Sequence, residues 1–288
     1  MERNAMENSI TPSTLYLVAT PIGNLEDITL RGLRILKEVD IIAAEDTRHS
    51  IKLLNHFEIK TKMVSYHQHN EKEGSEKLRA LLQEGKSIAL ISDAGMPIIS
   101  DPGFQLVRDC QEDGLNVEVV PGANAALCGV VLSGVDCRHF TFWGFIGKQS
   151  KDIKSAIEVL KHTPNPVVFY ESPHRLLKIL TQMAMVIPQR EMSISREITK
   201  RYQETKRGTV EELLAWFQVH PPKGEFVLVV DGGGDAVQND EKESLIIGEM
   251  QVHLDYYIQG GMGEKEAMKQ VAKDRGIGKR EVYQELKV

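Results

Sequence analysis

Short apolar runs alternate with amphipathic helical patterns along the first half of the chain. Such runs are typical of strands that a sheet buries on both faces. The clearest helical pattern covers 71–83, where Leu78, Leu81 and Leu82 share one face and Gly85 closes the helix. The expected strands are 15–19, 41–44, 63–66, 88–91 and 117–120. Because strands joined by helices run parallel, this alternation predicts an α/β fold with a mostly parallel sheet.

A second set of strand and helix patterns begins near Phe140. The expected strands are 140–145, 167–170, 192–195 and 226–230. Helical patterns around 153–160, 176–185 and 210–217 separate them. This set predicts a second α/β domain.

The end of the chain is helical in pattern. A glycine-rich, polar stretch after Asp231 predicts a flexible linker. A long helix is expected over 242–258, followed by helices over 264–274 and 279–286. The glycine-bearing turn between the last two fits a helix-turn-helix or a packed helical hairpin, and the sequence leaves both open.

These patterns divide the chain into five expected segments. They are a flexible leader at 1–13, an N-terminal α/β domain at 14–136, a C-terminal α/β domain at 137–232, a linker at 233–241 and a helical, helix-turn-helix-like tail at 242–288.

Composition narrows the class of protein. Hydrophobic residues make up 41% and charged residues 26%, which disfavours a disordered or fibrous chain. The net charge of −6 argues against an overall basic coat, although a local basic groove can still bind phosphates. Cys110, Cys128 and Cys137 suggest reduced thiols in a cytoplasmic protein, without metal-ligand spacing, so no metal is expected. Neither a signal peptide nor a membrane span is expected.

Loops that follow the strands of the first domain are the places to search for a ligand, because ligands of open α/β sheets bind at the carboxyl ends of strands. The segment 92–103 holds two Asp, two Gly, two Pro and two Ser, more than a simple connection needs. We expect its first half, 93–96, to contact a ligand. Asp101 is expected instead to cap a helix whose first residue is Pro102.

The sequence lacks the motifs that are typical of two classes of nucleotide-binding enzyme. The chain has no P-loop lysine and no G-x-G-x-x-G spacing, which argues against a nucleoside triphosphate or NAD. A Rossmann-like NAD-dependent oxidoreductase remains an alternative. A second alternative is a ligand-sensing regulator whose tail reads DNA through Lys279, Arg280 and Gln284.

Six ordered motifs resemble those of the small-subunit ribosomal RNA methyltransferases in the tetrapyrrole methylase superfamily. They are Leu-Val-Ala-Thr-Pro-Ile-Gly-Asn from Leu17, Glu-Asp-Thr-Arg from Glu45, the whole of 92–103, Val-Pro-Gly-Ala from Val120, Phe-Tyr-Glu-Ser-Pro-His-Arg from Phe169 and Arg-Glu-Ile-Thr-Lys from Arg196. The resemblance implies S-adenosyl-L-methionine as methyl donor, held in a cleft between two α/β domains. It also implies a homodimer, and the ribose 2′-oxygen of a decoding-centre cytidine in small-subunit rRNA, free or in the assembled subunit, as acceptor.

The same resemblance assigns the donor site residue by residue. The implied contacts are Pro21, Gly23, Asp93, Ala94, Gly95, Met96, Ser100, Ala123, Asn124, Phe169, Tyr170, Glu171 and Glu225. Many superfamily members open with G-x-G-x-G and use a Gly-Asp-Pro turn, whereas this chain has Ala19-Thr20-Pro21-Ile22-Gly23 and Ser92-Asp93-Ala94-Gly95. These departures point away from tetrapyrrole substrates.

Methyl transfer to a hydroxyl needs alignment and a proton acceptor. Candidates for the catalytic groups are Glu45, Asp46, Glu171 and Lys200, which lie at expected strand ends or in the motifs. For the Glu45 motif, a capped helix start with an internal ion pair is an equal alternative.

RNA contact needs local positive charge. The candidates are Arg48, His174, Arg175, Arg196, Lys200, Arg201, Lys206, Arg207, Lys279 and Arg280. A solvated basic face is the alternative for this set.

Overall fold

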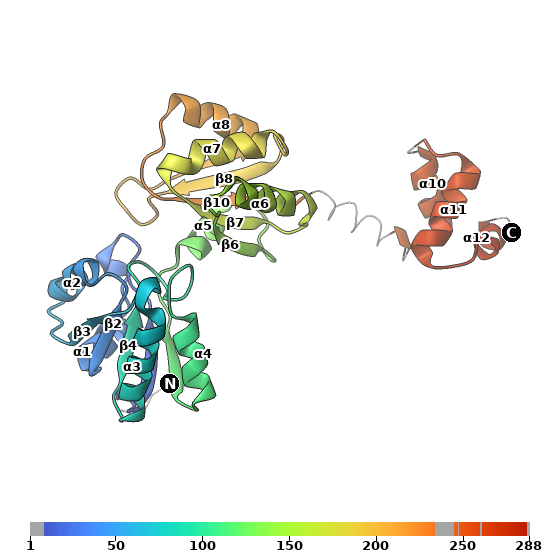
Figure 1. Ribbon diagram of the computed structural model, residues 1–288. Helices are drawn as coiled ribbons and strands as arrows, with labels where there is room; N and C mark the ends of the chain where they lie inside the picture. The colour runs from blue at the N-terminus through green and yellow to red at the C-terminus, as the bar shows by residue number, and fades with distance from the viewer. Residues whose placement is uncertain (1–8, 234–244, 247, 260, 287–288) are drawn as a thin grey trace. The chain divides into compact units, whose positions relative to one another are not determined.

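A computed structural model describes residues 9–233, 245–246, 248–259 and 261–286. The described chain forms two compact units: residues up to 157 with 166–231, and 158–165 with the residues after 231. The first unit holds two five-stranded sheets and the second holds the C-terminal helices (Figure 1). The first eight residues of the expected leader and residues 234–241 of the expected linker lie outside the described residues.

The first sheet is parallel throughout. Its strands are β1 (Thr14–Val18), β2 (Ile41–Ala44), β3 (Lys62–Ser65), β4 (Ile88–Ile91) and β5 (Asn116–Val120). They lie in the order β3-β2-β4-β1-β5, and every pairing is parallel. The five apolar runs therefore are strands of one parallel sheet, as predicted.

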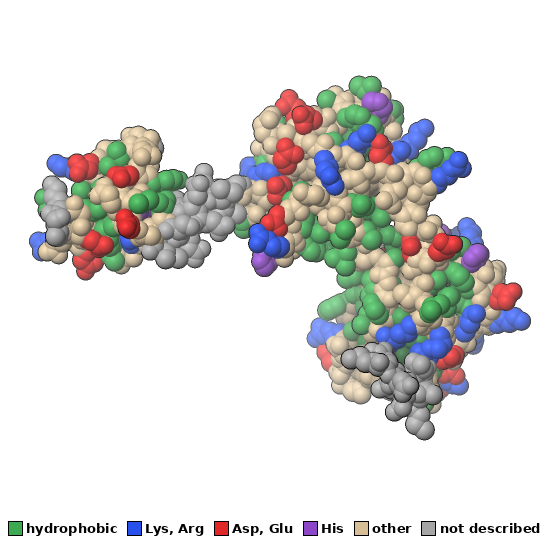
Figure 2. Space-filling model, turned by 180° about the vertical axis from the view of Figure 1, so that it is seen from behind, with side chains coloured by type: hydrophobic (Ala, Val, Ile, Leu, Met, Phe, Trp, Pro, Cys, Tyr) green, Lys and Arg blue, Asp and Glu red, His purple; other side chains and the backbone are tan. Residues whose placement is uncertain are grey.

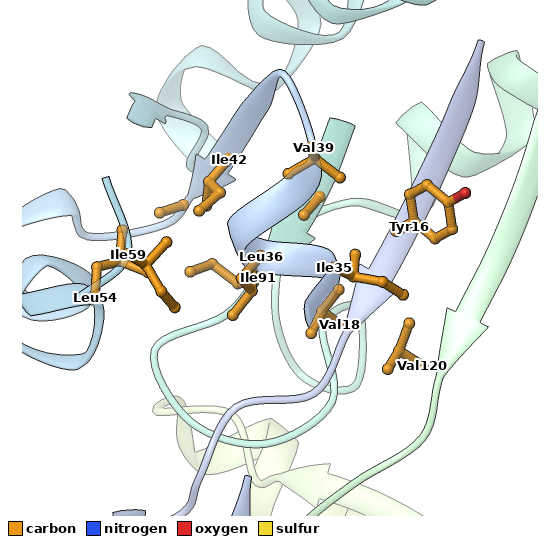
Figure 3. Packing of buried hydrophobic residues seen from close by; sticks show 12 residues of the cluster. Tyr16, Val18, Ile35, Leu36, Val39, Ile42, Leu54, Ile59, Ile91 and Val120 are labelled. Carbon is orange, nitrogen blue, oxygen red and sulfur yellow. The ribbon is translucent and has the colours of Figure 1, made fainter. Parts of the chain in front are cut away.

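Helices cover both faces of this sheet. The elements between its strands are η2 (Leu25–Asp27), α1 (Leu30–Glu38), α2 (Thr47–His56), η3 (Gln68–Asn70), α3 (Glu71–Gln83) and α4 (Phe104–Glu112). Residues of α1 and α2 share one apolar cluster with Tyr16 and Val18, whereas α3 and α4 share another with Leu15. Because successive strand side chains point to opposite faces, β1 contributes to both clusters. Figure 3 shows the first cluster converging between α1 and the sheet.

The second sheet is mixed. Its strands are β6 (Thr141–Phe145), β7 (Val167–Glu171), β8 (Glu191–Arg196), β9 (Glu204–Thr209) and β10 (Phe226–Val230). The order is β6-β7-β10-β8-β9, and only β6 and β7 pair in parallel. Its helices are α6 (Ser150–His162), α7 (Pro173–Ala184) and α8 (Val210–Val219). Four of these strands were expected; β9 was not.

Helix α5 (Ala125–Ser133) follows β5 of the first sheet but packs on the second. Gly129 permits this, since a Cβ on it would lie 2.5 Å from Cγ1 of Val227 in β10. The backbone N–H of Ala126 also donates to the Tyr170 hydroxyl at the end of β7, at 3.0 Å. The start of α5 is thereby held beside the end of β7.

The C-terminal unit contains α10 (Met250–Gln259), α11 (Glu264–Arg275) and α12 (Lys279–Leu286). They enclose their own apolar cluster, which includes Leu254, Val271 and Val282. The expected single helix over 242–258 is wrong in its described part, because Gly248 lies in a bend and α10 begins two residues later. Within the described residues, no helix is long and apolar enough to cross a membrane.

Candidate active site

A cavity of about 330 Å³ lies in the first unit, where the loops of the first sheet face the second sheet. This volume is within the range of small-molecule sites. The lining residues are Ile22, Asp93, Ala94, Gly95, Met96, Ile99, Ser100, Asp101, Asn124, Ala125, Phe145, Tyr170, Glu171, Ser172, Glu197, Ile198, Lys200, Glu225, Phe226 and Val227.

The 92–103 loop forms one wall of the cavity and is fixed by its backbone. Thr20 and Gly95 exchange hydrogen bonds, N–H to carbonyl in both directions, at 2.9 and 3.0 Å. Ile98 and Ser100 have φ of 75° and 70°, a left-handed conformation that is costly for a β-branched residue such as Ile98. Strain of this kind persists only where surrounding contacts impose it, and it gathers at ligand sites.

Asp101 does not cap the helix as predicted. Helix α4 begins at Phe104, and its N-cap residue is Gly103 with φ of 130°. The Gly103 N–H donates to Oε1 of Glu71 at 3.0 Å, so this donor at the helix start already has a partner. Asp101 instead lines the cavity, and the Glu45 carboxyl group is among its charged neighbours.

The carboxyl groups around Asp101 favour protonation. Burial, together with the charge of Glu45, raises the pKa of Asp101 to about 7. Burial and the neighbouring Asp93 likewise raise the pKa of Glu45. Glu45 follows β2 and Asp93 follows β4, and these strands are paired with Ala44 opposite Ile91, so the two side chains emerge at one edge of the sheet.

Asp46 and Arg48 form the capped helix start that was the alternative for their motif. The Asp46 carboxylate accepts from the Arg48 backbone N–H at 2.8 Å and pairs with the Arg48 side chain at 2.9 Å. Hydrogen bonds from that side chain and from the Arg48 backbone lower the pKa of Asp46 to about 2. Neither residue lines the cavity.

Glu171 at the end of β7 is a buried wall residue. Its side chain is 1% exposed, and Oε1 accepts from the Ser172 N–H at 2.8 Å. Arg175 lies 3.6 Å from Oε2, but this oxygen has no hydrogen-bond partner among the described residues. Burial raises the pKa of Glu171. A buried carboxylate oxygen that lacks a hydrogen-bond partner beside a cavity suits a ligand that donates a hydrogen bond.

Lys200 closes another side of the cavity. Its ammonium pairs with Glu197 at 3.0 Å and Glu225 at 2.8 Å. Its stem lies on Gly23, where a Cβ would be 2.4 Å from Cγ of Lys200. Burial lowers the pKa of Lys200, but the hydrogen bonds to both glutamates together have the larger effect, so the pKa is raised.

Most residues assigned to the donor site meet at this cavity. Nine line it, namely Asp93, Ala94, Gly95, Met96, Ser100, Asn124, Tyr170, Glu171 and Glu225. Pro21, Gly23, Ala123 and Phe169 do not: Phe169 is fully buried in the core, and Ala123 lines a second hollow of about 610 Å³ that shares Ile22, Asn124 and Ile198 with the first.

Sequence reasoning left several lining residues out of the site. They are Ile22, Ile99, Asp101, Ala125, Phe145, Ser172, Ile198 and Val227. A signal existed for some of them, because Asp101 lies inside a recognised motif, Phe145 ends β6 and Ser172 directly follows β7.

The expected RNA-contacting residues are mostly engaged within the protein. Arg196 and Lys206 both pair with Glu204, at 3.1 and 3.0 Å, and Lys206 also lies over the Trp216 ring. The Arg207 guanidinium donates to the Leu132 carbonyl. On the face drawn in Figure 2, Lys and Arg are interspersed with Asp and Glu. Arg201 and His174 are exposed, and Lys279 and Arg280 are exposed at the start of α12.

The charge of the cavity wall indicates the kind of ligand. It carries five acidic side chains, at Asp93, Asp101, Glu171, Glu197 and Glu225, against the one ammonium of Lys200. Such a wall attracts a cation and repels phosphate. Within the described residues, no group of three or more His, Cys, Asp or Glu side chains could hold a metal ion.

Known proteins share this fold. The structure of diphthine synthase aligns with a TM-score of 0.58 at 14% identity, covering 76% of this chain and 90% of that one. Uroporphyrin-III-C-methyltransferase from Thermus thermophilus aligns with a TM-score of 0.54 at 19% identity, covering 80% and 98%. At these identities the similarity establishes the fold.

Sequence relatives are much closer. Residues 14–214 match the family "Tetrapyrrole (Corrin/Porphyrin) Methylases". Ribosomal RNA small subunit methyltransferase I of Halalkalibacterium halodurans is 50% identical over 94% of this chain and 93% of its own length. The protein of the same name from Bacillus subtilis is 46% identical over 93% and 92%. The chain therefore belongs to the tetrapyrrole methylase family, within its group of ribosomal RNA small subunit methyltransferase I proteins.

Proposed function

We propose that this protein transfers a methyl group from S-adenosyl-L-methionine to the ribose 2′-oxygen of a decoding-centre cytidine in small-subunit rRNA. The observation that carries the proposal is the near full-length identity of 46–50% to proteins named for methylating small-subunit rRNA. The oxidoreductase and DNA-binding regulator alternatives have no support among these relatives.

The acidic cavity fits the donor. S-adenosyl-L-methionine carries a sulfonium and an ammonium, and both suit a wall with five carboxylates. The pyrophosphate of a dinucleotide would face the same carboxylates without a compensating arginine. Oε2 of Glu171, which has no hydrogen-bond partner among the described residues, supplies an acceptor for an N–H or O–H of the donor. When bound, the donor supplies a methyl group on a cationic sulfur.

The protein's own contribution is to bind, align and accept a proton. Alignment of the ribose oxygen with the methyl carbon lowers the barrier, and a base adds ~10²- to 10⁴-fold. Of the four proposed catalytic groups, Asp46 is engaged by Arg48, and Lys200 is held in its charged form by two glutamates. Glu171, whose pKa is raised and which lines the cavity, is the better proton acceptor, whereas Glu45 does not line the cavity.

RNA contact is proposed to depend on the exposed cations. Arg201 and His174 lie next to cavity residues Lys200 and Ser172, and the exposed Arg201 guanidinium lies over the Tyr202 ring. Lys279 and Arg280 offer further positive charge in the C-terminal unit. Arg196 and Lys206, which share Glu204, are expected to contribute less.

A homodimer in the cytoplasm completes the proposal. On α5, Leu127 is 54% and Val131 is 83% exposed, and both line the second hollow. This apolar face lacks the cations that RNA would need, and a second copy could cover it. All three cysteines are free thiols, in keeping with a reducing compartment. Light scattering coupled to gel filtration measures the oligomeric state.

Transfer of labelled methyl groups tests the activity. The full-length protein is incubated with methyl-labelled S-adenosyl-L-methionine and, separately, purified rRNA, small subunits and large subunits. Label in small-subunit RNA alone is expected. Label in large-subunit RNA, or none in any RNA despite donor binding, would overturn the proposed acceptor.

A further inference from the structure

Phe145, the last residue of β6, is an exposed aromatic residue on the lining of the cavity. Two large apolar residues of that lining are exposed, Ile99 at 41% and Phe145 at 57%. A lone exposed phenylalanine is ordinary on a protein surface. This one differs, because an irregularity of the backbone directs its side chain toward the cavity.

The irregularity is a β-bulge in β6. In the pairing with β7, Phe142 lies opposite Val168. Phe145 lies opposite Tyr170, only two residues further along β7, so Trp143 is an extra residue in β6. Regular alternation would place Phe142 and Phe145, three residues apart, on opposite faces of the sheet. The bulge brings them to one face, where both rings pack against the Tyr170 ring at centroid distances of 5.2 and 5.4 Å.

The bulge is held against the loop that forms the cavity wall. Gly144 has φ of 77°, a conformation that favours glycine. A Cβ on it would lie 2.9 Å from Oγ of Ser100, in the 92–103 loop. On the other side, the Tyr170 hydroxyl accepts from the Ala126 N–H at 3.0 Å, which fixes the ring beneath Phe145. The Phe145 ring is therefore held at the cavity before any ligand binds.

The charge of the wall limits which part of an RNA nucleotide can approach this ring. Five acidic side chains against one ammonium repel a phosphate. A nucleobase is uncharged and flat, and unpaired bases of RNA stack on aromatic side chains. Since every base has a π face, such a contact supplies affinity and alignment rather than the choice of base.

We propose that Phe145 stacks on the base of the nucleotide whose ribose accepts the methyl group. This inference rests on the proposed function, since it takes an RNA nucleotide to enter the cavity. A base held on the Phe145 ring also holds the ribose bonded to it, and so presents the 2′-oxygen to the methyl carbon of the donor. The nucleotide leaves the stack of its RNA neighbours to enter, and stacking on Phe145 offsets part of that loss.

Methyl transfer by full-length Phe145 variants tests the contact. Small ribosomal subunits that lack the modification serve as acceptor, with methyl-labelled S-adenosyl-L-methionine as donor. Phe145→Leu keeps an apolar side chain but removes the ring, so kcat/KM for the subunits is expected to fall about 5- to 150-fold, the loss of one base–aromatic stack. Phe145→Tyr keeps the ring and is expected to stay within about threefold of wild type.

The affinity for the donor separates the acceptor from the donor as the group on the ring. Calorimetry of S-adenosyl-L-methionine binding without RNA is expected to give affinities within about twofold of wild type for both variants, because the lost contact belongs to the acceptor. Phe104→Leu is the matched control, since Phe104 at the start of α4 is 65% exposed and does not line the cavity. Circular dichroism with thermal melting checks the fold of each variant.

Three results would overturn the inference while leaving the proposed function intact. They are a kcat/KM of Phe145→Leu equal to that of the control, an equal loss in Phe145→Leu and Phe145→Tyr, and a loss of donor affinity that matches the loss of kcat/KM. The last result would place the ring on the donor. A wild-type protein that binds the donor but methylates no small subunit would instead overturn the proposed function.

Discussion

Asp101, in the loop after β4, has the acidic side chain of Glu45, which follows β2, as a charged neighbour. Burial and the neighbouring charge raise the pKa of Asp101 from 3.8 to about 7. An acid whose pKa is higher in the folded state binds its proton more tightly when folded. Its contribution therefore favours folding at low pH and is lost as the pH rises from about 4 through 7.

Asp101→Asn replaces the acid with a side chain that cannot ionise, so folding at neutral pH no longer requires a charged carboxylate to be buried. The variant is expected to exceed the wild type in free energy of unfolding at pH 7.5, by on the order of 1 kcal/mol after a discount for solvent screening. At pH 4.5 the difference should be small, because Asp101 is then protonated in the folded protein. Urea unfolding at both pH values measures it. An equal difference at the two values would show that Asp101 does not titrate in this range.

Glu171→Ala tests the unpaired oxygen of the cavity wall. Loss of a hydrogen bond to a charged group of about 1.5–3 kcal/mol corresponds to roughly 10- to 150-fold weaker binding of S-adenosyl-L-methionine. Calorimetry measures the affinity, with the exposed Glu191→Gln in β8 as control. If Glu171→Ala binds the donor as tightly as the control, Glu171 is a structural residue only.

Gly103→Ala tests the fixed backbone of the 92–103 loop. Its φ of 130° is unfavourable for alanine, and the new Cβ would lie 2.8 Å from Leu90 and 3.0 Å from Ile98. We expect destabilisation by about 2 kcal/mol and weaker donor binding. Gly114→Ala is the control, since Gly114 also has positive φ but open space around it. Equal destabilisation by the two variants would mean that the close packing of Gly103 against Leu90 and Ile98 does not contribute to stability.

Arg201→Ala tests the exposed cation next to Lys200. Loss of one phosphate contact should weaken RNA binding several-fold and reduce the slope of log affinity against log salt by about 1. Donor affinity should stay unchanged. Arg108→Ala on α4 serves as the control, and filter binding at several salt concentrations provides the measurement. An unchanged salt slope would place RNA elsewhere on the protein.

Apolar patterning made most of the fold predictable. The strands β2, β4 and β10 begin and end where the sequence pattern placed them, because each is fully buried and almost wholly apolar. Strand β9 escaped prediction because its sequence, Glu-Thr-Lys-Arg-Gly-Thr, has no apolar alternation. It is an edge strand held by backbone pairing to β8, with Lys206 on Trp216, and its basic residues suggested an RNA surface.

The sequence identified which loops form the site, but not which side chains contact one another within it. The motif at 92–103 marked the cavity wall, yet local rules favoured Asp101 as a helix cap next to Pro102. What decides its position is the Gly103 N–H bonded to Glu71 and the distant Glu45, two tertiary contacts that no local pattern contains. Lys200 is similar in part, because its partner Glu225 lies in a distant segment, whereas its other partner, Glu197, is three residues away in the same motif.

Nucleoside mass spectrometry of the product RNA tests the central claim most directly. Small subunits lacking the modification are incubated with the wild-type protein and S-adenosyl-L-methionine, and the rRNA is digested and mapped. The account predicts 2′-O-methylcytidine at a single decoding-centre position, which depends on the donor. Methylation on a base, on another nucleotide or outside the small-subunit rRNA would contradict it.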